Sequence, residues 1–340
     1  MKCLKAIFLS VFLTWLVWAF PCHAQESLRH EEVKFQNADV TLSGTLTLPA
    51  SRRPHPALVI IHAAGLEKRV DYRDYAEGFA RNGVAVLAYD MRGVGASTGN
   101  PLLPTFEDLA GDALAGVQFL KSRSDINPKQ IGLWSLSRGG LTAPLVAARS
   151  GEVAFMVLVS PVVVTPFENE VRSLESRLRD ARFSPSEVGE AVALYKRGIE
   201  VARTGEGYEA FSASFQGARN EKWFSYLPIT QLPPKEHFSW QNLRRVMSYD
   251  PAPVWEKIAC PVLAIFGGMD TAISVEENKA RLRAALKRGK NRNYTIKVFP
   301  KANHLLQLAE TDAAGKSLDK GLITGYFETM ITWVRKHVRA

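Results

Sequence analysis

Apolar runs and amphipathic stretches alternate along most of the chain. Close to the start, Val40–Leu48 alternates apolar and polar residues with a period of two, which predicts a strand of an antiparallel sheet. Continuous apolar runs, typical of strands buried on both faces, follow at Ala57–Ile61, Val84–Ala88, Ile131–Trp134, Phe155–Val159 and Val262–Phe266. Stretches with a helical pattern separate the first four of these runs, at Tyr72–Asn82, Thr105–Arg123 and Gly139–Arg149. This alternation predicts a mostly parallel sheet with helices on both faces.

The alternation stops between Pro161 and Pro261. Long amphipathic stretches occupy much of this interval, at Glu168–Arg182 and Pro185–Arg203, and an aromatic-rich segment follows them. The sheet pattern then resumes. The simplest organisation is one α/β domain with a helical cap inserted into it, the core comprising residues 25–161 and 261–340 and the cap residues 162–260.

The first segment has the order of a secretory signal peptide. Lys2 and Lys5 precede an apolar run, Ala6–Phe20, and Cys22–Ala24 follows as a small-residue end. The run is shorter than the roughly 20 residues of a membrane span, which disfavours the alternative of an uncleaved anchor. We therefore expect residues 1–24 to be removed, and a secreted or periplasmic chain that starts at Gln25 and has no stable membrane anchor.

Composition and charge narrow the classes of partner. With 340 residues, 46% of them hydrophobic, the chain can bury a substantial core. Removing Lys2 and Lys5 lowers the net charge from +9 to +7, and the remaining basic residues are scattered. No nucleic-acid-binding motif accompanies them, so we expect no nucleic-acid partner. No cluster has the spacing of metal ligands, and we predict neither a metal nor a cofactor.

A buried strand followed by a helix start surrounds the sequence Ser135–Gly140. Such a tight strand-to-helix turn can hold a nucleophilic serine above the sheet edge, but it crowds the backbone and needs small residues two positions before and after the serine. Ser137 satisfies this through Ser135 and Gly139, whereas Ser135 would need a small residue in place of Leu133. Ser135 replaces the first glycine of the usual Gly-x-Ser-x-Gly pattern. The turn therefore favours Ser137 while leaving Ser135, or a purely structural turn, as alternatives.

A base must remove the proton of a serine nucleophile. Where a serine lies on such a strand-to-helix turn, the acid and then the histidine follow it along the chain. The candidate bases after Ser137 are therefore His237, His304 and His337. His337 belongs to a basic terminal stretch, and His237 falls inside the predicted cap. His304 lies in the loop after the predicted strand Thr295–Phe299, where the base is expected.

The acid is expected at the end of the strand that resumes after the cap. Asp270 occupies this place, after Gly267–Gly268, which would free the turn. Its carboxylate would hold the imidazole in the right tautomer. Glu276 and Glu277 are weaker candidates farther along the chain. Two backbone amides would complete the site by binding the developing oxyanion, one from Arg138 and one from the loop after the Ala57–Ile61 strand.

Several motifs occur together and in order: His62-Ala63-Ala64-Gly65, Asp90-x-Arg92-Gly93-x-Gly95-x-Ser97, the Ser137 turn, Tyr249-Asp250-Pro251-Ala252-Pro253, Asp270 and Asn303-His304. From about Val33 to its end, the chain resembles secreted bacterial α/β-hydrolases of the serine-aminopeptidase-like esterase branch. The resemblance implies an α/β-hydrolase fold, a mostly parallel central sheet flanked by helices with an inserted helical cap. It also implies that Ala64 supplies the second oxyanion amide. Two departures, Ala63 for a glycine and Leu136 for a histidine, bear on the acyl pocket.

The motif residues other than Ser137, Asp270 and His304 are expected to be structural. Asp90 and Arg92 would tie down a loop at the strand end, and His62 would be a buried structural histidine. Within the cap, aromatic residues such as Trp223 and Trp240 either line an apolar substrate pocket or hold the cap together.

The function that these expectations favour is a serine hydrolase acting on small-molecule carboxylic esters through an acyl-enzyme. A serine peptidase of aminopeptidase type and a non-catalytic binding protein of the same fold remain as alternatives. The oligomeric state is left open.

Overall fold

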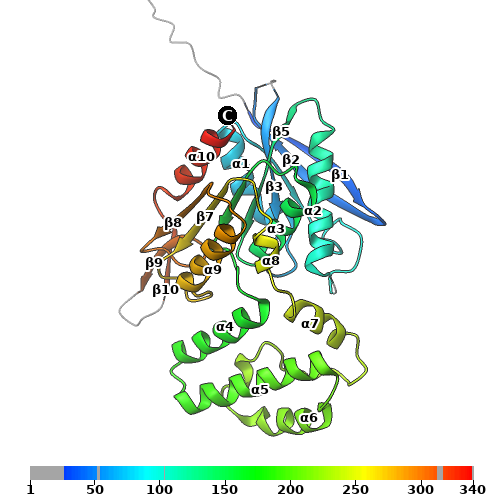
Figure 1. The fold of residues 1–340 in the computed structure, drawn as a ribbon, viewed down its shortest axis with the longest axis vertical. Coiled ribbons are helices and arrows are strands. Elements are labelled where there is room, and N and C mark those ends of the chain that lie inside the picture. The colour runs from blue at the N-terminus through cyan, green and yellow to red at the C-terminus, as the bar shows by residue number, and fades with distance from the viewer. Residues whose placement is uncertain (1–26, 52–53, 103, 312–316, 339–340) are drawn as a thin grey trace, which may run out of the picture.

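An eight-stranded sheet forms the centre of the computed structural model, which describes residues 27–51, 54–102, 104–311 and 317–338 (Figure 1). The strands lie in the order β1-β2-β4-β3-β5-β6-β7-β8. Their bounds are β1 Arg29–Asn37, β2 Val40–Leu48, β3 His55–Ile61, β4 Ala85–Tyr89, β5 Ile126–Leu136, β6 Met156–Val159, β7 Val262–Gly267 and β8 Tyr294–Phe299. A separate hairpin consists of β9 Gln307–Thr311 and β10 Ser317–Leu322.

The direction of the strands follows the sequence pattern. The alternating segment forms β2, which pairs antiparallel with β1 and β4. The remaining neighbours, from β4 across to β8, are parallel. Each of the five continuous apolar runs lies in one of the strands β3 to β7, and every residue of β4, β6 and β7 is buried. The predicted α/β-hydrolase fold class is therefore confirmed.

Helices cover both faces of the sheet. One face packs against α2, α3, α8 and α9, the other against α1 and α10. Their bounds are α1 Arg73–Arg81, α2 Phe106–Lys121, α3 Gly139–Ser150, α8 Ala252–Trp255, α9 Val275–Arg288 and α10 Tyr326–His337. The two apolar clusters between sheet and helices fix the strand ends, and the candidate site residues lie at or just beyond those ends.

The remaining helices form a separate layer below the core (Figure 1). They are α4 Pro166–Asp180, α5 Pro185–Thr204, α6 Tyr208–Gly217 and α7 Ser239–Met247. This layer, which we call the cap, has an apolar cluster of its own that extends from Val171 to Trp240. Val162, Val164 and Trp255 pack instead into the sheet cluster. The helical layer is thus narrower than the predicted interval 162–260, because both connecting segments are anchored in the core.

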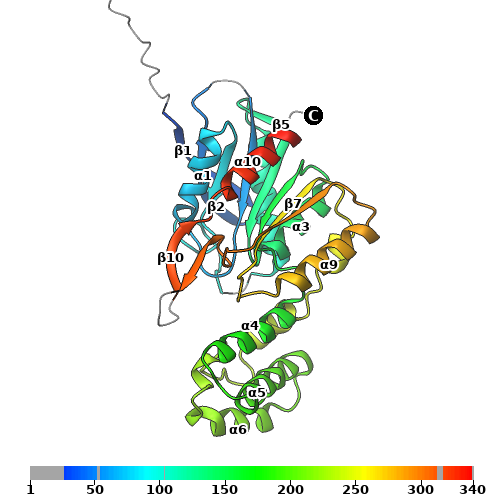
Figure 2. The same cartoon turned by 90° about the vertical axis from the view of Figure 1, so that its left-hand side faces the viewer.

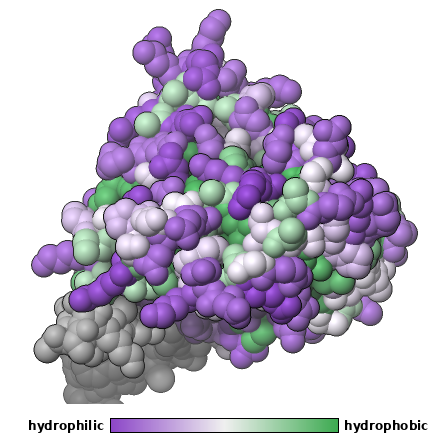
Figure 3. Space-filling view, turned by 90° about the horizontal axis from the view of Figure 1, so that it is seen from below, coloured by the Kyte–Doolittle hydropathy of each residue, from purple (hydrophilic) through white to green (hydrophobic). Residues whose placement is uncertain are grey.

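Contacts at one end of α4 join the cap to the core. The side-chain oxygen of Asn278, which is buried on α9, accepts a hydrogen bond from the backbone N–H of Val163 at 2.6 Å. Figure 2 shows α4 running close to α9. Charged side chains of both helices pair across this junction, as in Arg172–Glu277 at 2.5 Å and Arg281–Glu168 at 3.1 Å. Seen from the cap side, the surface is mostly hydrophilic, with apolar residues scattered among the polar ones (Figure 3).

The predicted signal peptide, residues 1–24, lies outside the described residues. Of the helices that are described, none combines the length and hydropathy needed to cross a membrane.

Candidate active site

Ser137 occupies a sharp turn between β5 and α3. Its φ is +53°, in the left-handed region that non-glycine residues rarely adopt, at a cost of about 1–3 kcal/mol. Backbone hydrogen bonds maintain this conformation: the N–H of Ser137 donates to the carbonyl of Val159 at 2.8 Å, and its carbonyl accepts from Gly140 at 2.9 Å and Val162 at 3.0 Å. The turn separates the Ser137 side chain from both the strand and the helix.

Close packing explains the glycines after the serine. A Cβ on Gly139 would lie 2.8 Å from the Cβ of Ser135 and 3.0 Å from the carbonyl oxygen of His62. A Cβ on Gly140 would lie 2.7 Å from the Cβ of Pro161. At 2.8 and 2.7 Å from neighbouring Cβ atoms, neither position has room for a side chain. The small residues that the spacing predicted are therefore required by the contact between α3 and the strand ends.

Ser135 is buried inside the sheet. It has no solvent exposure, and its hydroxyl has no hydrogen-bond partner within the described part of the chain. The structure thus places Ser137, and not Ser135, where a second group can reach its hydroxyl.

Three predicted residues meet in one hydrogen-bonded chain. The Nε2 atom of His304 lies 2.8 Å from the Oγ of Ser137, and its Nδ1 lies 2.7 Å from the Oδ2 of Asp270. The carboxylate of Asp270 is fully buried, and its other oxygen accepts the backbone N–H groups of Ala272 at 2.8 Å and Ile273 at 3.1 Å. The carboxylate therefore stays fixed while it orients the imidazole.

Backbone contacts hold the loops of Asp270 and His304 together. A Cβ on Gly267 would lie 2.1 Å from the carbonyl oxygen of Asn303, so this glycine is required by the close approach of the two loops. Its φ is not positive, and a freer turn is not the reason for its presence. The hydroxyl of Ser160, at the end of β6, donates to the carbonyl of His304 at 2.8 Å. Sequence reasoning missed Ser160, for which no local pattern exists.

The loop after β3 holds its backbone with a buried acid. The N–H of Ala63 donates to the carboxylate of Glu67 at 2.6 Å, and the hydroxyl of Tyr72 donates to the same oxygen. Burial raises the pKa of Glu67. Glu67 thus accepts the hydrogen bond of the Ala63 N–H, and the N–H of the next residue, Ala64, is not bonded to this acid. Glu67 was not predicted, since it carries no recognised motif.

The two predicted oxyanion amides have no partner in the described residues. Neither the backbone N–H of Ala64 nor that of Arg138 donates a hydrogen bond there. Arg138 is the first residue after Ser137 and precedes the first turn of α3. Free amides of this kind suit a developing negative oxygen.

Asp90, Arg92 and His62 have the structural roles that were predicted for them. Asp90 is buried and accepts the backbone N–H groups of Arg69 and Ala96, both at 2.9 Å. Arg92 makes two hydrogen bonds of 2.7 Å to a single carboxylate on α2. His62 bonds a backbone carbonyl at 2.7 Å, and burial lowers its pKa.

The other candidate residues lie elsewhere. His337 stacks on Trp333, and His237 bonds Ser239 within the cap. Glu276 and Glu277 form ion pairs on α9. None of these four side chains bonds His304, Asp270 or Ser137 in the described part of the molecule.

An apolar cavity of about 240 Å³ lies inside the cap. Aliphatic and aromatic side chains form nearly all of its wall, and the single charged residue is Glu170; the lining comprises Glu170, Leu194, Tyr195, Gly198, Ile199, Phe211, Phe215, Leu227, Pro228, Ile229, Leu243 and Met247. Trp223 and Trp240 are absent from this wall and are buried in the apolar cluster of the cap. The aromatics singled out in the sequence thus hold the cap together, and Tyr195, Phe211 and Phe215 face the cavity.

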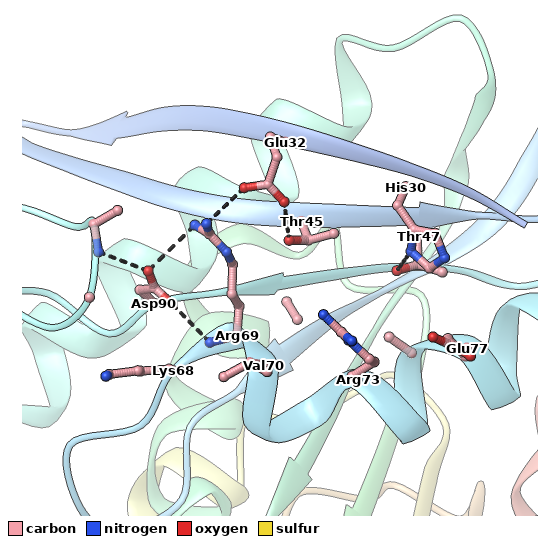
Figure 4. Close-up of a pocket in the computed structure, with 14 residues that line it drawn as sticks. His30, Glu32, Thr45, Thr47, Lys68, Arg69, Val70, Arg73, Glu77 and Asp90 are labelled. Carbon is pink, nitrogen blue, oxygen red and sulfur yellow. Dashed lines mark hydrogen bonds and ion pairs between the residues drawn. The ribbon is translucent and has the colours of Figure 1, made fainter.

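A larger cavity, of about 690 Å³, is polar and contains no triad residue (Figure 4). It lies between the first two strands and α1. Its acids are mostly paired internally: Arg69 contacts Glu32 at 2.7 Å and Asp90 at 3.4 Å, as the dashed lines in Figure 4 mark. These contacts hold the segment that follows the Ala63 loop, so we assign this network a supporting role.

No three His, Cys, Asp or Glu side chains group together in a way that could hold a metal ion, as far as the described residues go. The absence of a metal or cofactor requirement stays a prediction.

Proteins of known name are similar to this chain in sequence. A 285-residue segment is 25% identical to esterase EstD of Thermotoga maritima, covering 80% of this chain and 60% of EstD. A 274-residue segment is 26% identical to thiohydrolase apmlB of Arthrinium phaeospermum, covering 77% of this chain and 87% of that protein. The chain thus spans less than two thirds of EstD.

The fold and a family model agree with these similarities. The crystal structure of the α/β hydrolase GrgF from Penicillium sp. superimposes with a TM-score of 0.59 at 20% identity, covering 92% of this chain and 98% of GrgF. The family model described as serine aminopeptidase, S33, matches residues 52–312, which is more than half of the sequence. The chain therefore belongs to the S33 serine aminopeptidase-like family of α/β hydrolases.

Proposed function

We propose that this protein is a serine hydrolase that cleaves carboxylic esters, with Ser137, His304 and Asp270 as its catalytic triad. The observation that carries the proposal is the hydrogen-bonded chain from Asp270 through His304 to Ser137, with distances of 2.7 and 2.8 Å. Serine hydrolases need this arrangement, because a hydroxyl becomes an effective nucleophile only when a base takes its proton.

The reaction proceeds in two halves. As the Oγ of Ser137 forms a bond to the ester carbonyl carbon, the Nε2 of His304 takes the hydroxyl proton, and the carboxylate of Asp270 stabilises the imidazolium. His304 then gives this proton to the departing alcohol, which leaves an acyl group on Ser137. In the second half His304 takes a proton from water, the resulting nucleophile attacks the acyl carbon, and the acid leaves as the proton returns to Ser137.

The amides of Ala64 and Arg138 are proposed as the oxyanion hole. Their N–H groups have no other partner among the described residues, and Glu67 holds the neighbouring amide of Ala63. Removing one such donor typically lowers kcat by about 100–1,000-fold.

The cap cavity is proposed to take an apolar part of the substrate. The cavity is lined almost wholly by aliphatic and aromatic groups, which fits the usual character of small-molecule sites. Glu170, on the cavity wall, is within electrostatic reach of Arg138, the neighbour of Ser137, which supports placing this cavity close to the site.

Aminopeptidase activity is the closest rival. It would require cap carboxylates free to bind an amino terminus, and α4 carries four acids, Glu168, Glu170, Glu175 and Asp180. Glu168 caps its own helix and pairs with Arg281, and Glu175 pairs with Arg179. Glu170 and Asp180 make no ion pair within the described residues, and of the four acids only Glu170 lies on the wall of the cap cavity, which favours esters over peptides. Because apmlB is named a thiohydrolase, thioesters belong among the acyl substrates to compare.

Labelling with a fluorophosphonate tests the proposal. We expect one covalent adduct, on the tryptic peptide that contains Ser137, and hydrolysis of 4-nitrophenyl butanoate well above that of the matched thioester and anilide. A protein that binds acyl compounds without being labelled would instead be a non-catalytic member of the fold. Faster cleavage of an amino-acid anilide would establish the peptidase.

We also propose that the chain is exported and loses residues 1–24. The support is the charged start, the short apolar run and the small-residue end of this segment. Amino-terminal sequencing of the protein from an extracytoplasmic fraction is expected to begin at Gln25. An intact Met1 in washed membranes would contradict it.

A further inference from the structure

Arg138 brings a positive charge next to Ser137 without an ionic partner. Its guanidinium lies over the ring of Phe106, 5.8 Å from the centroid. In the described part of the chain no carboxylate oxygen comes within 4.0 Å of it, and it donates no hydrogen bond. Arg92, by comparison, makes two hydrogen bonds of 2.7 Å to Asp112. The donors of Arg138 thus have no protein acceptor among the described residues.

Two carboxylates, one in the cap and one in the core, act on this guanidinium from beyond ion-pair distance. Glu170, on α4 of the cap, and Glu67, in the loop after β3, both act on it electrostatically. Burial is the larger effect and lowers the pKa of Arg138, while the two carboxylates oppose this change. The guanidinium thus belongs to the residue next to Ser137, stacks on Phe106 and is within electrostatic reach of one acid of the cap and one of the loop after β3.

Neither acid satisfies the guanidinium. Glu67 already accepts the N–H of Ala63 and the hydroxyl of Tyr72, and it makes no ion pair with Arg138. Glu170 stands on the wall of the apolar cavity, beyond ion-pair distance. Arg138 is half-buried. A cation taken out of water without a hydrogen-bonded acceptor is unfavourable, and a ligand carboxylate would supply that acceptor.

We propose that Arg138 is a specificity-determining residue that binds a carboxylate on the substrate, so that the preferred substrates are acidic esters such as half-esters of dicarboxylic acids. The inference rests on the proposed esterase function. The planar guanidinium matches a carboxylate with two parallel hydrogen bonds, which a neutral ester cannot replace. Glu170 repels the same carboxylate and so directs it to Arg138, leaving the cap cavity to the apolar part of the substrate.

The test compares two esters that differ by one carboxylate. The ratio of kcat/KM for mono-4-nitrophenyl succinate to that for 4-nitrophenyl butanoate is measured for the wild type and for Arg138→Met. We expect this ratio to fall by at least about tenfold in the variant, mainly through KM, as for the loss of one charge-assisted hydrogen bond. Arg138→Lys is expected to recover part of the ratio, because it restores the charge without the planar fork.

A second pair, 4-butanoyloxybenzoate and 4-butanoyloxybenzamide, places the carboxylate on the alcohol side. Arg149→Met is the matched control: it removes an exposed arginine from α3, the helix that follows Arg138. Among the described residues its guanidinium bonds only the carbonyl of Glu107, and the variant should keep both ratios. The proposal is overturned if Arg138→Met changes both esters of each pair by the same factor. If wild-type Ser137 is not labelled by a fluorophosphonate and no ester is cleaved, it is the proposed function that fails.

Discussion

The surroundings of Ser137 in the core and the exposed start of α5 in the cap tolerate change to different degrees. In the core, the residues around Ser137 touch backbone atoms so closely that one added carbon on Gly139 or Gly267 would overlap its neighbours. In the cap, an added Cβ on Gly189 of α5 meets nothing within 4 Å. The cap has an apolar cluster separate from that of the sheet, and Asn278 and a few ion pairs join the two parts.

This difference separates the side chains proposed to carry out the reaction from those proposed to select the substrate. The reacting atoms are positioned by strand ends that are buried on both faces, so their geometry depends on the whole sheet. The cavity wall is formed by helices that pack mainly on each other, so it can change without disturbing the triad. Substitutions in the core should therefore alter rates for all substrates alike, and substitutions in the cap should alter the preference among them.

The largest effect is expected from Ser137→Ala. Turnover of 4-nitrophenyl butanoate should fall by about 1,000-fold or more, as for other triad serines, while the fold is retained. Ser135→Ala is the matched control, because it removes a buried hydroxyl that has no described partner and should leave stability nearly unchanged. Steady-state kinetics and thermal melts check both. Loss of activity in Ser135→Ala but not in Ser137→Ala would overturn the assignment of the nucleophile.

The next effect concerns the cavity wall. Met247 is half-buried at the end of α7 and lines the cavity. Met247→Trp should move the preferred acyl chain to shorter lengths and Met247→Ala to longer ones, by about tenfold or more per methylene, because one methylene of fit is worth about 1–3 kcal/mol. A panel of 4-nitrophenyl esters measures this.

Trp223→Ala is the control for that series. Trp223 is only 3% exposed and packs in the cap cluster without facing the cavity. Its truncation should cost about 3–5 kcal/mol of stability and keep the chain-length profile. If Trp223→Ala shifts the profile as strongly as Met247→Trp does, the cavity is not the determinant.

Local patterns in the sequence were sufficient to single out Ser137, His304 and Asp270, which the structure brings together, and insufficient to find the residues that support their loops. Spacing around Ser137 reflects a steric demand within one turn, and the places of Asp270 and His304 follow from where parallel strands end. Glu67 and Ser160 act on backbone groups of Ala63 and His304 through contacts that only the folded chain creates. The periodic pattern of apolar and polar residues carries no information about such contacts.

The cap shows the same limit for apolar residues. Amphipathic stretches predicted α4 and α5 closely, because periodicity reports which helix face is buried. It does not report whether a buried aromatic meets another side chain or an empty volume. That distinction, between Trp223 or Trp240 and Phe215, is decided by how four helices pack on each other.

A smaller effect is expected from replacing one glycine in each region by alanine. Gly139→Ala forces a Cβ against Ser135 and the carbonyl of His62 and should cost about 1–3 kcal/mol, with loss of activity on every ester. Gly189→Ala in the exposed start of α5 should stabilise the protein by about 0.5–1 kcal/mol, since alanine favours the helix. Urea unfolding measures both. Equal tolerance at the two positions would contradict the contrast between core and cap.

The smallest effect is expected at the junction of α4 and α9. Arg281 pairs with Glu168 at 3.1 Å and with Glu277 at 3.4 Å, and its side chain is about half exposed. Exposed pairs contribute about 0–1 kcal/mol, so Arg281→Met should lower stability by less than 1 kcal/mol. The loss should vanish at 1 M salt, where charges are screened within about 3 Å. A substantially larger loss that salt does not reduce would mean that the junction is held by packing of the arginine stem, and that the cap is fixed to the core more firmly than its separate apolar cluster indicates.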